Sequence, residues 1–149
     1  MTMHRGTIRP LVICLFRHER RILLDLCFDP SRQLRFYRPL GGGIEFGEYA
    51  EDALRREIRE EISAEITAPR YLFTLENIFT FDNQRGHEIV LVYDAQFVDR
   101  TLYGQTSING VEEFDGDIPL EIRAEWRAIA DLRRPDAHPL FPNGLLERL

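Results

Sequence analysis

The chain has 149 residues, of which 44% are hydrophobic and 30% charged, and its formal net charge is −6. These values are typical of a soluble globular domain and argue against a disordered, fibrous or disulfide-stabilised protein. An acidic chain lacks the basic face that nonspecific nucleic-acid binding requires, so no nucleic-acid partner is expected. The apolar runs are too short to span a membrane and the N-terminus has no apolar signal segment, which predicts a cytoplasmic protein without membrane attachment.

Two segments rich in Ile, Leu, Val and Phe, residues 8–16 and 21–28, open the chain and predict a β-hairpin. In that pairing Cys14 lies opposite Leu23 and about 13 Å from Cys27, so the cysteines are predicted to be buried thiols. A third, shorter strand is predicted at residues 34–40. Pro39 near its end indicates an edge strand or a strand terminus. The glycines at 41–43 then predict a break where the backbone can approach a ligand closely.

The hydrophobic period changes at Ala50, where apolar residues begin to recur every four positions, which predicts an amphipathic helix over residues 50–62. Residues 71–81 and 87–97 predict a second hairpin, with residues 89–93 as a central strand. Residues 98–119 predict a long connection, residues 123–130 one more strand and residues 143–149 a short terminal helix. Strands on both sides of a single central helix predict an α/β (α+β) sandwich, with residues 1–149 as one domain.

The predicted helix places Glu57, Glu60 and Glu61 at positions i, i+3 and i+4, so the three carboxylates share one patch. Like charges this close repel, and two kinds of compensation are open. Arginines of the same helix can neutralise the patch as a solvated face. A hard divalent cation such as Mg²⁺, which prefers oxygen ligands, can bind it instead.

The sequence upstream of this patch contains a longer pattern in fixed register. Gly42, five intervening residues, Glu48 and seven further residues lead to Arg56-Glu57-Ile58-Arg59-Glu60-Glu61. This resembles the Nudix box, Gly-x5-Glu-x7-Arg-Glu-U-x-Glu-Glu-x-Gly-U, where U is aliphatic. Ser63 and Ala64 depart from the last Gly-U pair, and Ser63 stands where a glycine would cap the helix in a left-handed conformation.

The chain is therefore similar to Nudix (MutT-like) hydrolases, and the resemblance extends over most of its length. It implies a Nudix-type α/β/α sandwich with a mixed β-sheet and a central catalytic loop-helix-loop. It further implies that Glu57, Glu60 and Glu61 hold Mg²⁺ or Mn²⁺, with the Gly41 carbonyl as a further ligand.

The resemblance also implies catalytic roles. Arg56 and Glu48 look like the pair that orients the carboxylates, and Glu57 or an acid from residues 98–121 is the expected proton acceptor. The chemistry implied is hydrolysis of a nucleoside diphosphate linked to another group, by attack of water on phosphorus. The acids of residues 98–121 considered for this role are Glu112, Glu113 and Glu121, of which Glu121 stands closest to where some relatives supply a further ligand.

Several residues are candidates for substrate binding, each with a plainer alternative. Arg38 suits a phosphate contact or a surface ion pair. Asn143 suits a base edge or a helix N-cap. The aromatic residues that suit stacking on a base or packing in the core are Phe79, Phe81 and Tyr103.

The substrate class follows from the resemblance alone. Relatives selective for ADP-ribose tend to carry a Pro downstream of the box, and those selective for dinucleoside polyphosphates a Tyr, whereas residues 79–82 contain neither. A nucleoside triphosphate removed in pool cleaning is therefore the first expectation. The alternatives are an ADP-ribose or nucleotide-sugar pyrophosphatase and a non-catalytic Nudix-fold binding module, and a homodimer stays open.

Overall fold

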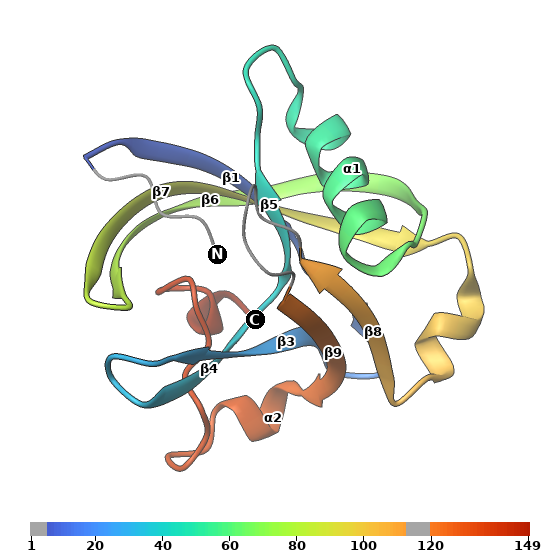
Figure 1. Cartoon of the computed structure of the whole chain (residues 1–149). Coiled ribbons are helices and arrows are strands. Elements are labelled where there is room, and N and C mark those ends of the chain that lie inside the picture. The colour runs from blue at the N-terminus through green and yellow to red at the C-terminus, as the bar shows by residue number, and fades with distance from the viewer. Residues whose placement is uncertain (1–5, 113–119) are drawn as a thin grey trace.

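The computed structural model describes residues 6–112 and 120–149, and its strands form two sheets beside one long helix (Figure 1). The elements in chain order, with η marking a 3-10 turn, are β1 (Ile8–Cys14), β2 (Arg17–His18), β3 (Arg21–Asp29), β4 (Leu34–Arg38), β5 (Leu40–Gly43), α1 (Ala50–Ile62), β6 (Ile66–Phe81), β7 (Gln84–Phe97), η1 (Arg100–Gly104), β8 (Ser107–Glu112), β9 (Leu120–Ala128), α2 (Ile129–Leu132) and η2 (Leu146–Arg148). In the described parts of the chain, no helix is long and apolar enough to cross a membrane.

The first sheet is mixed, with strand order β5-β1-β7-β6, because β1 runs parallel to β7 and antiparallel to β5. The second sheet has the order β2-β3-β9-β8, with β4 also paired to β3. The predicted α/β class, the mixed sheet and the helix over 50–62 are all confirmed. The predicted central strand is confirmed as well, since β7 lies between β1 and β6.

The predicted N-terminal hairpin is wrong. β1 pairs with β5 and β7, whereas β3 pairs with β2, β4 and β9 in the other sheet. Only the two-residue strand β2 turns back on β3, through Glu19 and Arg20, whose φ angles of 50° and 62° make a tight turn. Val12, Ile13 and Cys14 are buried in succession, as expected for a strand covered on both faces. Cys14 therefore lies beside Leu40 and Tyr93 rather than opposite Leu23, and both cysteines are free thiols.

The glycine run predicted as a break is a strand instead. Pro39 separates β4 from β5, and residues 41–43 pair with β1 in antiparallel register. Close packing explains the glycines, because a Cβ on Gly41 would lie 2.1 Å from the Val12 carbonyl oxygen. A side chain at this position would thus force the two strands apart.

The second half of the chain contains more strand than expected. The second hairpin is confirmed, but its turn is only Asp82 and Asn83, both with positive φ, and each of its strands begins earlier than predicted, at Ile66 and Gln84. Residues 98–112, predicted as connection, contain η1 and β8, and residues 113–119 lie outside the described parts. The predicted terminal helix shrinks to η2, whose N-cap is Leu145, so an N-cap role for Asn143 is wrong.

Two buried clusters hold these layers together. One joins α1 to both sheets, through residues such as Leu54, Ile58, Phe16 and Phe97. The other joins the opposite faces of the sheets and receives α2 and η2, with Leu145 fully buried. The helical layer on this second side is therefore much shorter than α1.

Candidate active site

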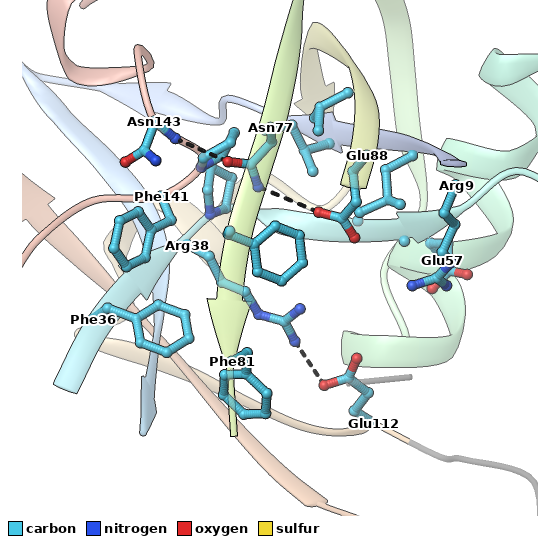
Figure 2. Close-up of a pocket in the computed structure, with 18 of the residues that line it drawn as sticks. Arg9, Phe36, Arg38, Glu57, Asn77, Phe81, Glu88, Glu112, Phe141 and Asn143 are labelled. Atoms are coloured by element: carbon cyan, nitrogen blue, oxygen red, sulfur yellow. Dashed lines mark hydrogen bonds and ion pairs between the residues drawn. The ribbon is translucent and has the colours of Figure 1, made fainter. Parts of the chain in front are cut away.

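A cavity of about 640 Å³ lies between the two sheets and beside α1 (Figure 2). Its lining comes from β1, the turn between β3 and β4, β4, β5, α1, β6, β7, β8 and the C-terminal segment. Glu57 and Arg9 lie on one side of the close-up, and Phe36, Phe81 and Phe141 on the other. The aromatic end suits a flat apolar group of a ligand, and the charged end suits a polar part of the same ligand.

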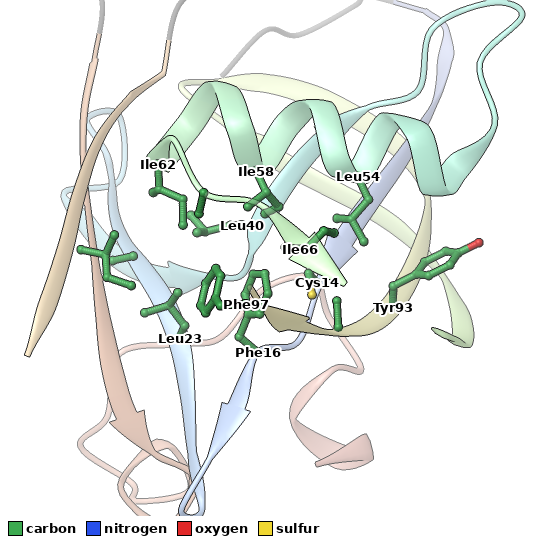
Figure 3. Close-up of a cluster of buried hydrophobic side chains, with 14 of the residues drawn as sticks. Cys14, Phe16, Leu23, Leu40, Leu54, Ile58, Ile62, Ile66, Tyr93 and Phe97 are labelled. Atoms are coloured by element: carbon green, nitrogen blue, oxygen red, sulfur yellow. The ribbon is translucent and has the colours of Figure 1, made fainter. Parts of the chain in front are cut away.

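α1 presents three glutamates to this cavity and its apolar stripe to the core (Figure 3). The glutamates are Glu57, Glu60 and Glu61, and the stripe is Leu54, Ile58 and Ile62. β5 passes directly beside the glutamates. A Cβ on Gly42 would lie 2.4 Å from the Glu57 carboxyl carbon, so Gly42, the first glycine of the box, leaves the space that this carboxylate occupies.

Arg56 connects the loop before α1 with the glutamates. Its Nε and Nη2 each donate to an oxygen of Glu48 at 2.9 Å, and Nη2 also donates to the Gly43 carbonyl. Its Nη1 donates to Glu57 at 2.9 Å and to Glu60 at 3.3 Å. These hydrogen bonds lower the pKa of Glu48. Arg56 thus holds Glu57 and Glu48 in one fixed arrangement.

Glu61 is the most deeply buried of the three glutamates, with 3% of its surface exposed. Its Oε1 accepts a hydrogen bond of 3.0 Å from the Gly41 backbone N–H. Burial raises the pKa of Glu61 well above its ordinary value, and the nearby Glu112 and Glu57 carboxylates raise it further, although Arg38 opposes them. Burial also raises the pKa of Glu57, against the opposing effect of Arg56.

The arginines of α1 do not neutralise this patch together. Arg55 donates to the Ile66 carbonyl and Arg59 forms an ion pair with Glu65, so both point away from the glutamates. Arg56 is the one that contacts Glu57 and Glu60. The alternative in which the helix arginines neutralise all three glutamates on a solvated face therefore agrees poorly with the structure.

The donor set fits a divalent metal ion in kind. Glu57, Glu60 and Glu61 supply carboxylate oxygens, the ligands that such ions prefer. Burial raises the pKa of Glu57 and of Glu61, and a nearby cation would favour the ionised form of both carboxyls. Among the described residues, however, no three acidic, His or Cys side chains are gathered closely enough to hold a metal as they stand. Arg56 donates to Glu57 and Glu60, and the Gly41 N–H donates to Glu61, so a metal ion would compete with these donors for the carboxylate oxygens.

Arg38 faces the same glutamates from β4. Its Nη2 donates to Glu112 at 2.6 Å, and its Nε lies 3.9 Å from Asp25. Both Arg38 and Glu112 line the cavity, whereas Glu121 is exposed on β9 and is not among the lining residues. Of the acids considered after the box, Glu112 is therefore the one that the structure brings to the site, and Glu113 lies outside the described residues.

The aromatic end contains Phe79 and Phe81, as expected for ligand stacking, together with Phe36 and Phe141. Tyr103 does not reach it: its ring packs on Phe97 and Trp126, and its hydroxyl accepts a hydrogen bond from the Phe97 N–H. The stacking interpretation of Tyr103 is thus wrong, and the core interpretation is confirmed.

Asn143 lines the cavity next to two residues that the sequence did not single out, Asn77 and Glu88. The Asn143 N–H donates to Asn77 Oδ1, and Asn77 Nδ2 donates to Glu88 Oε1, both at 3.4 Å (Figure 2). Glu88 is 8% exposed, and burial raises its pKa. Period-two alternation could have revealed it, since positions 88, 90 and 92 share the buried face of β7.

The fold and the glutamates of α1 beside a cavity define a hydrolase scaffold. Residues 8–148 match the family model described as the NUDIX domain. The chain belongs to the Nudix family. This confirms the resemblance carried by Gly42, Glu48 and residues 56–61.

Solved structures with this fold are similar over most of their length. The match to a MutT Nudix hydrolase from Burkholderia pseudomallei covers 87% of this chain and 90% of that protein's chain, with a TM-score of 0.58 at 21% sequence identity. The match to a Nudix hydrolase from Nitrosomonas europaea covers 95% of this chain and 85% of that protein's chain, with a TM-score of 0.64 at 17% sequence identity. These identities support the shared fold.

A curated relative is similar over a shorter stretch. The NAD-capped RNA hydrolase NudC of Vibrio vulnificus is 34% identical over 70 residues, which are 47% of this chain and 26% of the relative. The matched stretch thus spans about a quarter of that protein.

Proposed function

We propose that this protein is a metal-dependent Nudix pyrophosphohydrolase that cleaves a nucleoside diphosphate linked to another group, with a nucleoside triphosphate as the first candidate. The observation that carries the proposal is the placement of Glu57, Glu60 and Glu61 on the wall of a cavity that ends in aromatic side chains. The carboxylates provide a site for Mg²⁺ or Mn²⁺ bound to phosphates, and the aromatic end provides a surface for a base.

In this proposal each charged residue has a distinct task. Glu57, Glu60 and Glu61, with the Gly41 carbonyl, would hold the metal ion. A bound metal ion would neutralise the phosphates and lower the pKa of the attacking water. Arg56 and Glu48 fix the direction of Glu57, so that its carboxylate can accept a proton from that water.

The ion pair of Arg38 and Glu112 is the second charged group of the site, and its arginine is the candidate for binding phosphates. Arg38 is held in the cavity by Glu112 and can donate to a phosphate when that ion pair opens. Glu112 is the second candidate for the proton acceptor, because it lies in the cavity and Glu121 does not. Asn143 is the candidate reader of the base edge, since it lines the cavity beside Asn77.

A substrate panel tests this function. Nucleoside triphosphates, ADP-ribose and nucleotide sugars are incubated with Mg²⁺ or Mn²⁺, and release of phosphate and pyrophosphate is measured. We expect turnover of at least one triphosphate, and Glu57→Gln and Glu61→Gln should each lower kcat by at least about 10²-fold because charge stabilisation in the transition state is lost.

Glu65→Gln is the matched control, because it makes the same chemical change at an exposed residue outside the cavity. Its kcat should stay within about twofold of wild type. Exclusive turnover of ADP-ribose or a nucleotide sugar would replace the first substrate candidate. Turnover by Glu57→Gln at the wild-type rate would remove the assignment of the site, and no turnover of any compound would favour a binding module.

A further inference from the structure

Two hairpins from different sheets meet at their tips beside the cavity (Figure 1). The turn between β3 and β4 belongs to the second sheet, and the turn between β6 and β7 belongs to the first. A hydrogen bond of 3.1 Å from the Asp82 N–H to Asp29 Oδ1 joins them across 53 positions of the sequence. The two tips are therefore connected by specific contacts.

Asp29 is the centre of this connection and has no exposed surface. Its Oδ1 accepts hydrogen bonds from the N–H and the hydroxyl of Ser31, at 3.0 and 2.9 Å, as well as from Asp82. Its Oδ2 accepts a hydrogen bond of 2.7 Å from Arg32 Nε. Burial acts to raise the pKa of Asp29, but the hydrogen bonds from Arg32, Ser31 and Asp82 outweigh it and lower the pKa to about 2.

Arg32 makes the second link between the tips. While its Nε contacts Asp29, its Nη2 donates to the Thr80 carbonyl at 2.8 Å. A planar guanidinium fixed at two edges has little freedom to turn. We call this group the tip clasp; its members are Asp29, Ser31, Arg32, Thr80 and Asp82.

The tip clasp forms part of the aromatic end of the cavity, because Arg32 and Thr80 line it beside Phe81. Phe81 follows Thr80 on β6, and Phe36 lies on β4, with ring centroids 6.1 Å apart and planes at 80°. The two rings come from opposite sheets: β6 is paired with β7, whereas β4 is paired with β3 and, at Tyr37, with the C-terminal segment. The contacts between the tips therefore help to determine where Phe81 lies relative to Phe36.

We infer that Asp29 is a positioning residue: through Arg32 and the Asp82 N–H it holds the β6–β7 tip against the β3–β4 turn and so fixes the aromatic wall that binds the base. The nature of the occupant rests on the proposed function. A purine covers more of such a wall than a pyrimidine does, so the clasp also sets base selectivity. None of the clasp contacts involves the carboxylates of α1.

Asp29→Asn tests the inference, because it removes the charge but keeps the shape. For a purine nucleoside triphosphate we expect KM to rise about tenfold, as for loss of part of one base-stacking contact, while kcat stays within about twofold. The ratio of kcat/KM for purine over pyrimidine triphosphates should fall. A role in general folding alone would not change this ratio.

Asp94→Asn is the matched control, since Asp94 forms an ion pair with Arg70 on the same hairpin but outside the cavity. It should leave KM and the purine ratio unchanged. Arg32→Ala is a second variant, which leaves the buried Asp29 in place should Asp29→Asn fold poorly. If both residues act through the tip clasp, the double variant should be no worse than the more damaging single variant.

Amide hydrogen exchange tests the clasp without turnover. Exchange at residues 80–82 should accelerate at least about tenfold in Asp29→Asn and Arg32→Ala and stay unchanged in Asp94→Asn, because local opening becomes easier. Unchanged exchange in both clasp variants would overturn the inference, as would an unchanged KM and purine ratio. If the wild-type protein hydrolyses no nucleotide, the proposed function fails, and the exchange result still decides whether Asp29 positions the tip.

Discussion

Arg56 shows how a single side chain can prepare a site made of like charges. It contacts Glu48 with two nitrogens and both Glu57 and Glu60 with the third, so one guanidinium joins three carboxylates. Lys could not do this, because its single ammonium lacks the planar fork. The fixed Glu57 then occupies the space left by Gly42.

Glu88 is a buried carboxyl whose titration can be followed through stability. Burial raises its pKa above the ordinary value of 4.5, while Asn77, Arg9 and Arg38 act in the opposite direction. A carboxyl with a raised pKa contributes stability that is fully present below its unfolded pKa. This contribution is lost as the pH rises through the folded pKa.

Glu88→Gln does not titrate, and its amide oxygen can still accept the hydrogen bond from Asn77. We therefore expect its free energy of unfolding, relative to wild type, to increase between pH 4 and pH 8. Urea unfolding at several pH values measures this. Glu65→Gln is the control with the opposite sign, because the ion pair with Arg59 lowers the pKa of Glu65. A difference between wild type and Glu88→Gln that is constant with pH would contradict the expectation.

The glutamates of α1 that line the cavity were predictable because the box fixes their spacing along one helix. The residues of the aromatic end were predictable only in part. Phe79 and Phe81 could be named, but Phe36 and Phe141 reach the cavity from segments whose placement depends on the fold. Period-two patterns show that a strand has a buried face, not which partner covers it.

At the scale of elements, the end of α1 departs from the family pattern in a measurable way. Ser63 adopts a left-handed conformation with φ 55° and ψ 33°, and its N–H donates to the Arg59 carbonyl. The expected left-handed cap is therefore confirmed with a residue that has a Cβ. Such a conformation is strained for any residue other than glycine.

Ser63→Gly should raise the free energy of unfolding by up to about 1 kcal/mol, because it removes that strain. Chemical denaturation of both proteins measures the change. Ser107→Gly in β8 is the matched control, since its φ is not positive and the same change should destabilise by roughly 0.5–1 kcal/mol. If Ser63→Gly destabilises as much as Ser107→Gly, the turn depends on the serine side chain.

The helix was predictable from local pattern, whereas strand pairing was not. Four-residue steps over 50–62 suffice to define α1, because its hydrogen bonds are internal. The first two strands looked like a hairpin, since adjacent apolar segments usually pair. Here β1 instead pairs with β7, more than 70 residues away in sequence, and such a partner leaves no local trace.

At the scale of the molecule, the cavity exists because two sheets and one helix converge without filling the space between them. α1 supplies carboxylates from one side, and the tip clasp holds the aromatic wall on the other. A ligand that spans both would contact the carboxylates and the aromatic rings at once. Metal binding can nevertheless be tested without the substrate.

Mn²⁺ should stabilise the whole fold if the glutamates of α1 bind it, because the folded chain binds the ion and the unfolded chain does not. At 100 times the dissociation constant this amounts to about 2.7 kcal/mol, or several degrees in Tm for a domain of this size. The measurement compares melting in Mn²⁺ with melting in Na⁺ at matched ionic strength. The two salts are compared within each variant, because Glu61→Gln also changes a buried carboxyl.

The shift should shrink in Glu61→Gln and persist in Glu65→Gln, whose side chain lies outside the cavity. Because Arg56 and the Gly41 N–H already occupy the carboxylates, the metal has to compete for them, and binding should be weaker than to a preformed site. Mn²⁺ is a better probe than Mg²⁺ for this reason, since Mg²⁺ gives up its water reluctantly. Identical melting of the wild-type protein in Mn²⁺ up to roughly 10 mM and in Na⁺ would mean that the glutamates do not bind metal without substrate.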